Sequence, residues 1–319
     1  MITVIIPYFQ REAGVLRRSL HSIATQKDCP LPIHTIVVDD SSPVPAQDEV
    51  MAAGSLPGTL EIIRQPNGGP GSARNTGLDR APKETRYIAF LDSDDEWSDD
   101  HLARAVLALR QGYDFYFADL YQLGQTIGAF ARAGQLNPAK HPLLPGTSEL
   151  HEYQGDMFDQ IICGNVIGTP TVVYGFKRFP KLRFRVEFTH AGEDYLFWMA
   201  VAHENAKIAF SSAVEVTCGK GVNVYSGSGW GTEQHLRRLH NEIKFRKTIS
   251  RMFPVTTRQK AHIDDGVRKL REAVGLELLH RLSHRRRTPL KLLWSHLTVD
   301  PLSYVLVPAL AARMLLKRD

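Results

Sequence analysis

Cysteines and long apolar runs are scarce in this sequence. The 319 residues include three cysteines, Cys29, Cys163 and Cys218, which are far apart and form no Cys-x-x-Cys pair. This pattern argues against a disulfide framework and against a cysteine zinc site. No stretch approaches the roughly 18 uninterrupted apolar residues of a spanning helix, and residues 1–7 lack the basic region of a signal peptide. We therefore expect a cytoplasmic protein that does not cross a membrane.

Composition is ordinary for a globular protein, but charge is unevenly distributed. Hydrophobic residues make up 43% of the chain and charged residues 23%, which excludes a disordered or fibrous protein. Residues 1–234 hold 20 Lys and Arg against 27 Asp and Glu, whereas residues 235–319 hold 19 against 7. An acidic body is thus followed by a basic tail, which would attract nucleic acid or anionic lipid.

Short predicted strands alternate with predicted helices over the first 120 residues. Segments rich in β-branched and aromatic residues predict strands at 3–6, 34–39, 60–64, 87–92 and 114–118. Helical spacing and helix starts lie between them, at 13–26, 45–53, 71–80 and 100–111. This alternation predicts an α/β protein with a doubly wound, mostly parallel sheet, in which ligands bind at the carboxyl ends of the strands.

The rest of the chain is less regular. Residues 121–185 are rich in Gly and Pro and predict an irregular insertion, which is followed by a helix near 193–202. A long helical stretch is expected over 234–286, and an apolar segment broken by prolines ends the chain.

The octapeptide at 90–97, FLDSDDEW, follows a predicted strand. In an extended chain Asp92 and Asp94 would face the same side. Two aligned carboxylates could hold Mg²⁺ or Mn²⁺ together with diphosphate oxygens. A solvated acidic loop or a helix N-terminus would carry the same residues, so the octapeptide alone leaves both interpretations open.

A second acidic pair, Asp39 and Asp40, ends another predicted strand. One carboxylate could face a ligand and accept the imide N–H of a uracil, while the other satisfies backbone donors in the turn. Turn chemistry alone explains the pair equally well.

A glycine-rich approach to a helix, GGPGSARN, occupies 68–75. Backbone N–H groups and the Arg74 guanidinium could meet phosphate at this helix start. The segment lacks both the Gly-Lys-Ser/Thr of a P-loop and the G-x-G-x-x-G of a dinucleotide fold, so by itself it indicates a turn.

Glu193 and Asp194 open an aromatic helix at 193–202. Carboxylates are favourable in any first turn because of the helix dipole. Near apolar surface, however, such a group could act as a general base that removes a proton from an incoming hydroxyl.

Taken together, these motifs resemble the family 2 glycosyltransferases, the inverting group with the GT-A fold. The matching elements stand in family order at 4–11, 38–42, 67–77, 90–95 and 192–194, and the resemblance covers residues 1–230. The sequence departs at 9–10, where Phe-Gln replaces the usual Tyr-Asn at the edge of the nucleotide pocket.

The resemblance implies roles for individual residues. It assigns to the nucleotide-sugar pocket Pro7, Tyr8, Arg11, Asp40, Asn67, Arg74, Asp92 and Ser93. Asp40 would contact the base and Asp92 the ribose. Asp94, with Asp92, would hold a Mn²⁺ or Mg²⁺ ion on the diphosphate. Asp194 would be the catalytic base, with Glu193 beside it.

The resemblance also implies an organisation and a function. Residues 1–120 would bind the nucleotide-sugar, 121–233 would bind the acceptor and carry the base, and 234–319 would form a basic helical extension. The expected reaction is metal-dependent, inverting transfer of a sugar from a nucleotide donor, UDP above all, to a glycan or lipid-linked saccharide in cell-surface polysaccharide synthesis. Alternatives are a nucleotidyltransferase that makes a sugar nucleotide and a nucleic-acid-binding protein that acts through the tail.

The apolar end of the basic tail carries a separate expectation. Residues 288–317 are too broken to span a bilayer and too apolar for a solvated face, which suits an anionic membrane surface on the cytoplasmic side. Packing on the same chain or on a second subunit is the alternative, so an oligomer stays open. Few aromatic residues and no recognition motif lie in the tail, so we expect no nucleic-acid partner.

Overall fold

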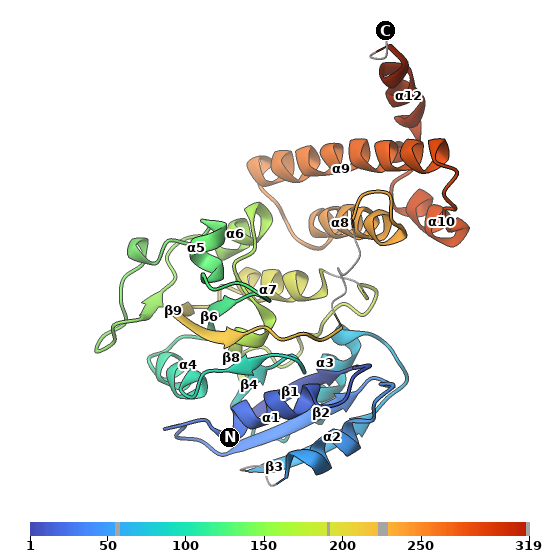
Figure 1. Cartoon of the computed structure of the whole chain (residues 1–319). Coiled ribbons are helices and arrows are strands. Elements are labelled where there is room, and N and C mark those ends of the chain that lie inside the picture. Colours follow the sequence, from blue (N-terminus) through green and yellow to red (C-terminus); the bar gives the residue numbers. More distant parts are fainter. Residues whose placement is uncertain (55–57, 190–191, 223–228, 317–319) are drawn as a thin grey trace. The chain divides into compact units, whose positions relative to one another are not determined.

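The computed structural model describes residues 1–54, 58–189, 192–222 and 229–316 (Figure 1). The chain divides into two compact units, one formed by residues 1–189 and 193–222 and the other by 190–192 and 223–319. Each unit is described by itself below.

The first unit is built on one mixed sheet. Its strands are β1 (Ile2–Tyr8), β2 (Ile33–Asp39), β3 (Thr59–Arg64), β4 (Tyr87–Phe90), β5 (Glu96–Trp97), β6 (Phe115–Tyr121), β7 (Leu150–Glu152), β8 (Val173–Gly175) and β9 (Ile208–Thr217). The strand order is β3-β2-β1-β4-β8-β6-β9-β5, and β7 pairs with β9. The longer pairings, β1 with β2 and β4, β2 with β3, and β6 with β9, are parallel. The predicted doubly wound, mostly parallel α/β architecture is confirmed.

Helices of the first unit connect these strands. They are α1 (Val15–Ala24), α2 (Ala46–Ala53), α3 (Pro70–Arg80), α4 (His101–Arg110), α5 (Ala129–Ala133), α6 (Met157–Cys163) and α7 (Glu193–His203), with 3₁₀ turns at Pro138–Lys140, Thr169–Thr171 and Phe176–Arg178. Strands from both sides of residue 120 share the sheet. The boundary expected at residue 120, between a nucleotide-sugar-binding part and an acceptor-binding part, is therefore a division of function, and it stays a prediction.

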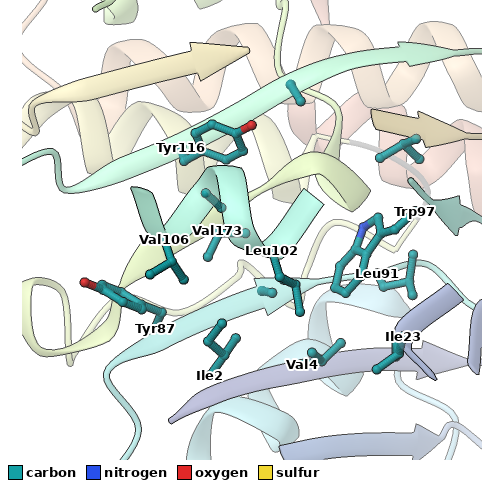
Figure 2. Close-up of a cluster of buried hydrophobic side chains, with 14 of the residues drawn as sticks. Ile2, Val4, Ile23, Tyr87, Leu91, Trp97, Leu102, Val106, Tyr116 and Val173 are labelled. Atoms are coloured by element: carbon teal, nitrogen blue, oxygen red, sulfur yellow. The ribbon is translucent and has the colours of Figure 1, made fainter. Parts of the chain in front are cut away.

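The alternation of side chains along β1 determines which helix covers which face. Val4 belongs to a buried cluster with Ile23 of α1 and Leu102 of α4 (Figure 2). Ile5 points to the opposite face, where a Cβ at Gly77 of α3 would lie 2.5 Å from its Cγ2 atom. A glycine inside α3 therefore allows this helix to approach the sheet closely, and α3 carries Arg74 toward the carboxyl edge.

Aromatic side chains join α7 to the sheet. Phe90, at the end of β4, lies 6.3 Å from Phe197 and 6.2 Å from Trp198 between ring centroids. Phe184 stacks on Phe197 at 4.4 Å. Because Phe90 directly precedes the acidic loop at 91–95, this packing brings the start of α7 near that loop.

The second unit is helical. It contains α8 (Glu233–Met252), α9 (Thr257–Ser283), α10 (Leu290–Val299), α11 (Leu302–Val305) and α12 (Val307–Leu316). The long helical stretch expected over 234–286 consists of two helices, because Pro254 follows α8 and Thr256 caps α9 through a capping box with Gln259. Within the part of the chain that the structure describes, no helix is long and apolar enough to cross a membrane.

A charged centre and an apolar core hold the second unit together. The apolar core contains Leu236, Leu239, Ile243, Val274 and Leu292. The fully buried carboxylate of Asp300 pairs with Lys247 of α8 at 3.1 Å and with Arg271 of α9 at 2.6 Å. Breaking either pair would leave a buried charge poorly compensated, so Asp300 ties the end of α10 to both long helices.

Candidate active site

Loops from three strands meet at the carboxyl edge of the sheet. The backbone N–H of Gln10, after β1, donates to the Ser42 hydroxyl after β2 at 2.8 Å. The Gln10 side-chain amide donates to the hydroxyl of Ser93, after β4, at 3.0 Å. Gln10 is 4% exposed, so these bonds form away from bulk water. The sequence reasoning treated this glutamine only as a departure from the family pattern and missed its linking role.

The acidic pair after β2 organises two neighbouring turns. Asp39 accepts backbone N–H groups at the turn and at the start of α2, as expected for one member of the pair. Asp40 is also occupied: its Oδ1 accepts the N–H of Gly68 and its Oδ2 that of Gly69, both at 2.8 Å. Asn67 donates to the Asp40 carbonyl oxygen at 2.9 Å. Oδ1 also accepts a hydrogen bond from the Gln65 side-chain amide at 2.8 Å, so a bond from Asp40 to a base would use the remaining lone pair of Oδ2. This role stays a prediction.

Arg74 is the centre of the site. Its side chain is 5% exposed and donates from Nη2 to Asp92 Oδ1 at 2.7 Å and from Nη1 to Glu193 Oε1 at 3.3 Å. The guanidinium also lies over the Phe184 ring, 5.3 Å from its centroid. Asn75, the next residue, brackets Phe184 by bonding both its N–H and its carbonyl oxygen. Helix α3 thereby joins the acidic loop after β4 to the start of α7.

The acidic loop forms a turn and does not continue the strand. Strand β4 ends at Phe90, and the N–H of Asp95 donates to the carbonyl oxygen of Asp92 at 3.0 Å. The prediction of a strand to residue 92, and with it the argument that alternation aligns Asp92 with Asp94, was therefore wrong. The chain turns here because the carboxylates are drawn to separate partners: Asp92 to Arg74, and Asp95 to the N–H of Gly219.

Asp94 lies against the segment that follows β9. A Cβ at Gly221 would be 2.3 Å from Asp94 Oδ2, so only glycine fits at this position without a shift. Burial and the neighbouring Asp92 carboxylate raise the pKa of Asp94 to about 6. The pKa of Asp95 is raised as well, by burial and by both neighbours. These carboxylates repel one another, and a bound cation would relieve that repulsion.

The carboxylates of the acidic loop could hold a cation that has few protein ligands. Across the described residues, no group of three or more His, Cys, Asp or Glu side chains could hold a metal ion. Mg²⁺ and Mn²⁺ sites at diphosphates need only one or two carboxylates, because water and phosphate oxygens complete the coordination. Asp94 suits such a site better than Asp92, one oxygen of which is committed to Arg74.

The two carboxylates at the start of α7 have different surroundings. Glu193 is 6% exposed and paired with Arg74 through Oε1, whereas its Oε2 has no hydrogen-bond partner among the described residues. Asp194 is half-buried and accepts a hydrogen bond from the Thr169 hydroxyl at 3.3 Å. Burial raises the pKa of both carboxyls, although Arg74 opposes the rise. A carboxylate with a raised pKa and partial exposure is suited to accept a proton.

The remaining predicted residues lie around the first loop. Tyr8 is 1% exposed and belongs to the core, which leaves its ring no direct access to a ligand in this structure. Pro7 is half-buried and Arg11 is exposed. Their assignment to the nucleotide pocket stays a prediction.

Several contributors carry no sequence signal of their own. Gln10, Phe184, Thr169 and Gly221 reach the site through tertiary contacts, from positions far apart in the chain. For the hydrogen bonds between Asn75 and Phe184, the sequence indicated one partner, because Asn75 belongs to the motif at 67–77.

Replacing Arg74 with alanine should lower the free energy of unfolding by about 3 kcal/mol at pH 8, because two carboxylates lose a shared partner. The loss should be smaller at pH 6. Burial already raises the pKa of Glu193, so the folded variant would bind a proton that the unfolded chain does not, and this difference favours folding as pH falls. Urea denaturation at both pH values measures the effect.

Arg80 provides a matched control on the same helix. It forms an exposed pair with Glu61 at 2.7 Å, so Arg80→Ala should cost less than about 1 kcal/mol at either pH. Equal losses for Arg74→Ala and Arg80→Ala would contradict the central position given to Arg74.

Two solved structures that hold sugar nucleotides are similar to this chain. Staphylococcus aureus TarS in complex with UDP-GlcNAc matches with a TM-score of 0.55 and 19% identity, over 88% of this chain and 86% of that one. The mannosyltransferase PcManGT from Pyrobaculum calidifontis, in complex with GDP-Man and Mn²⁺, matches with a TM-score of 0.56 and 17% identity, over 98% of this chain and 80% of that one. These likenesses confirm the expected GT-A fold.

Sequence comparisons identify the family. The succinoglycan biosynthesis protein ExoW of Rhizobium meliloti is 34% identical over 251 residues, which cover 75% of each chain. The minor teichoic acid biosynthesis protein GgaA of Bacillus subtilis is 33% identical over 119 residues, 36% of this chain and 25% of that protein. Residues 3–169 match the family described as Glycosyl transferase family 2. The chain therefore belongs to glycosyltransferase family 2 and is a glycosyltransferase.

Proposed function

We propose that this glycosyltransferase transfers a sugar from a UDP-sugar to a hydroxyl of a glycan or lipid-linked saccharide, with inversion, in polysaccharide synthesis. The observation that carries the proposal is the sharing of Arg74 between Asp92 and Glu193, which joins the acidic loop to the carboxylates of α7. Support for the donor comes from TarS in complex with UDP-GlcNAc. Support for the pathway comes from ExoW and GgaA, whose names refer to polymer biosynthesis.

Asp94, assisted by Asp92, would hold a Mn²⁺ or Mg²⁺ ion. The PcManGT complex with Mn²⁺ supports a cation in this fold. When bound, the ion would neutralise negative charge on the leaving diphosphate. Arg74 holds Asp92 in place and Gly221 lies against Asp94, so the chain itself fixes the carboxylates that a cation would need.

Asp194 would act as the general base. The acceptor oxygen forms the new bond to the anomeric carbon while the bond to the diphosphate oxygen breaks, and the electron pair leaves with UDP. Asp194 takes the acceptor proton, which its raised pKa favours. Thr169 orients the carboxylate through Oδ2, and Glu193 stays bound to Arg74. Attack from the face opposite the leaving group inverts the anomeric configuration.

Asp94→Asn should nearly abolish turnover and weaken nucleotide binding in the presence of Mn²⁺ or Mg²⁺, because an amide holds a cation poorly beside a diphosphate. Release of UDP from a UDP-sugar measures turnover, and removal of cations by a chelator should silence the wild type in the same way. Asp99→Asn is the control, since Asp99 is exposed and paired with Lys27. Full activity of Asp94→Asn in chelator would refute the cation assignment.

Asp194→Asn should lower the turnover number by about 10²–10⁴-fold and leave donor affinity nearly unchanged, as loss of a general base requires. Glu193→Gln is the matched variant one residue away. Because Glu193 pairs with Arg74, its loss should also affect stability and donor binding. Near-normal turnover of Asp194→Asn combined with an inactive Glu193→Gln would mean that the two roles are exchanged.

We further propose that the second unit docks on an anionic membrane surface, on the cytoplasmic side where a lipid-linked acceptor would be carried. Helix α10 buries Leu292 and His296, yet Leu290, Trp294 and Leu297 are 73%, 67% and 39% exposed. Spacings of four and three residues put these three on one stripe. An exposed tryptophan flanked by leucines is characteristic of a helix in the membrane interface.

Exposed apolar residues continue beyond α10, and basic residues accompany them. Leu302 is 53% exposed and Val305 69%. The exposed basic residues nearby in sequence are Arg285, Arg286, Arg287, Lys291 and Arg313. Each such residue near an anionic surface contributes about 1 kcal/mol.

Leu290→Gln combined with Trp294→Gln should reduce recovery of the chain with liposomes that contain phosphatidylglycerol, because the apolar stripe is lost. Co-sedimentation measures recovery. Met51→Gln combined with Ile127→Gln is the matched control, since these apolar residues of the first unit are 65% and 59% exposed. If wild type and both variants stay equally in the supernatant, the membrane proposal is wrong; dimerisation of the wild type alone would assign the stripe to a second copy.

A further inference from the structure

A cavity of about 700 Å³ lies in the first unit, away from the proposed catalytic groups. It is lined at the amino ends of β6 and β9 by residues that include Tyr113, Lys207 and Ile208. The acidic loop and the loop that follows β1 lie at the opposite edge of the sheet, where the parallel strands have their carboxyl ends. Strand β6 has seven residues, which places about 20 Å of extended chain between the two edges. The cavity is therefore separate from the site that contains Asp94.

Aromatic and polar side chains form part of the wall of this cavity, and small or apolar residues form the rest. Those that concern its chemistry are Tyr113, Glu152, Tyr153, Asp156, Asn205 and Lys207. The Tyr113 hydroxyl donates to Glu152 Oε2 at 3.2 Å, and the Tyr153 ring stacks on His141 at 5.0 Å. Burial raises the pKa of Tyr153 to about 12, so its hydroxyl keeps its proton at neutral pH. These contacts hold both rings in place before any ligand arrives.

Several polar groups of the wall have no protein partner among the residues that the structure describes. Tyr153 is half-buried, and Asn205 and Lys207 are exposed. Within the described part of the chain, neither the Tyr153 hydroxyl, the side-chain amide of Asn205 nor the Lys207 ammonium forms a hydrogen bond or an ion pair with another residue. Three unused groups from two separate segments, 152–157 and 205–208, thus line one cavity. Convergent polar groups beside aromatic rings are typical of a small-molecule site.

Charge and polarity narrow the class of ligand. Two carboxylates, Glu152 and Asp156, oppose the one ammonium of Lys207, which disfavours a phosphate or another anion. The wall has too many polar groups for a lipid chain. A neutral saccharide fits both constraints, because its hydroxyls pair with carboxylates and amides while its C–H faces pack on tyrosine rings.

We propose that this cavity binds a neutral oligosaccharide segment of the acceptor glycan, remote from the reacting end. This proposal rests on the proposed glycan acceptor. A chain held at the amino edge of the sheet would keep the polymer near the enzyme between transfers, so that the effective concentration of its reacting end rises without a new catalytic contact.

Two conservative substitutions test the proposal. Tyr153→Phe removes the hydroxyl and keeps the ring on His141. Asn205→Gly removes the amide and suits the backbone, because Asn205 has a φ of 54°. Saturation-transfer NMR titrations with β-1,3-linked glucotetraose, β-1,4-linked glucotetraose and mannotetraose give the affinity for each probe. We expect millimolar or tighter binding of at least one probe by the wild type, and at least a tenfold weaker affinity for the double variant.

Two controls separate this proposal from the proposed function. Asp28→Gly removes an exposed side chain at a φ of 53° and should leave saccharide binding unchanged. Slow hydrolysis of the UDP-sugar donor by Tyr153→Phe/Asn205→Gly should stay within twofold of the wild type, which also shows that the variant folds. If the wild type binds none of the three tetrasaccharides, or the double variant binds them equally well, the proposal is wrong. Absence of donor hydrolysis in the wild type would instead count against the proposed function.

Discussion

Arg74 carries a positive charge into the interior of the first unit, where carboxylates from two distant parts of the chain share it. Asp92 comes from the loop after β4 and Glu193 from the start of α7, 101 residues later. Neither carboxylate would be stable beside the other without the guanidinium, and the guanidinium would be costly to bury without them. Gly77 allows α3 to approach β1, and Phe184 covers the charged group. The arrangement of the residues proposed to act on the sugar donor and on the acceptor depends on the charge of Arg74.

That constraint separates the tasks of neighbouring carboxylates. Asp92 and Glu193 are committed to Arg74, which leaves Asp94 beside Gly221 and Asp194 beside Thr169 available for chemistry. Burial raises the pKa of both, which is consistent with the cation proposed for Asp94 and the proton transfer proposed for Asp194. In the proposed mechanism the two members of each acidic pair differ in role, because only Asp92 of the first pair and Glu193 of the second form an ion pair with Arg74.

Local patterns predicted the first half of the fold well. The alternation of short apolar segments with helical spacing identified β1 to β4, β6 and α1 to α4, because each of these elements shows the hydrophobic pattern of its own type within its own residues. The sequence reasoning missed β9, although Ile208–Thr217 is the longest strand of the sheet and pairs with β6. It also extended β4 by two residues, since the ion pair of Asp92 that ends the strand is a tertiary contact. For the same reason the motifs identified Arg74, Asp94 and Asp194 as candidates but gave no sign of Gln10, Phe184 or Thr169.

In the proposed reaction the acidic loop and the α7 carboxylates act together on a sugar nucleotide by a single displacement. It can be tested without knowledge of the acceptor, because water can replace it. Proton NMR of α-linked UDP-sugars incubated with the enzyme and Mn²⁺ would identify the first free sugar anomer released alongside UDP. We expect the β anomer to form first, before mutarotation, and to be absent with Asp194→Asn. Initial release of the α anomer, or of pyrophosphate in place of UDP, would contradict it.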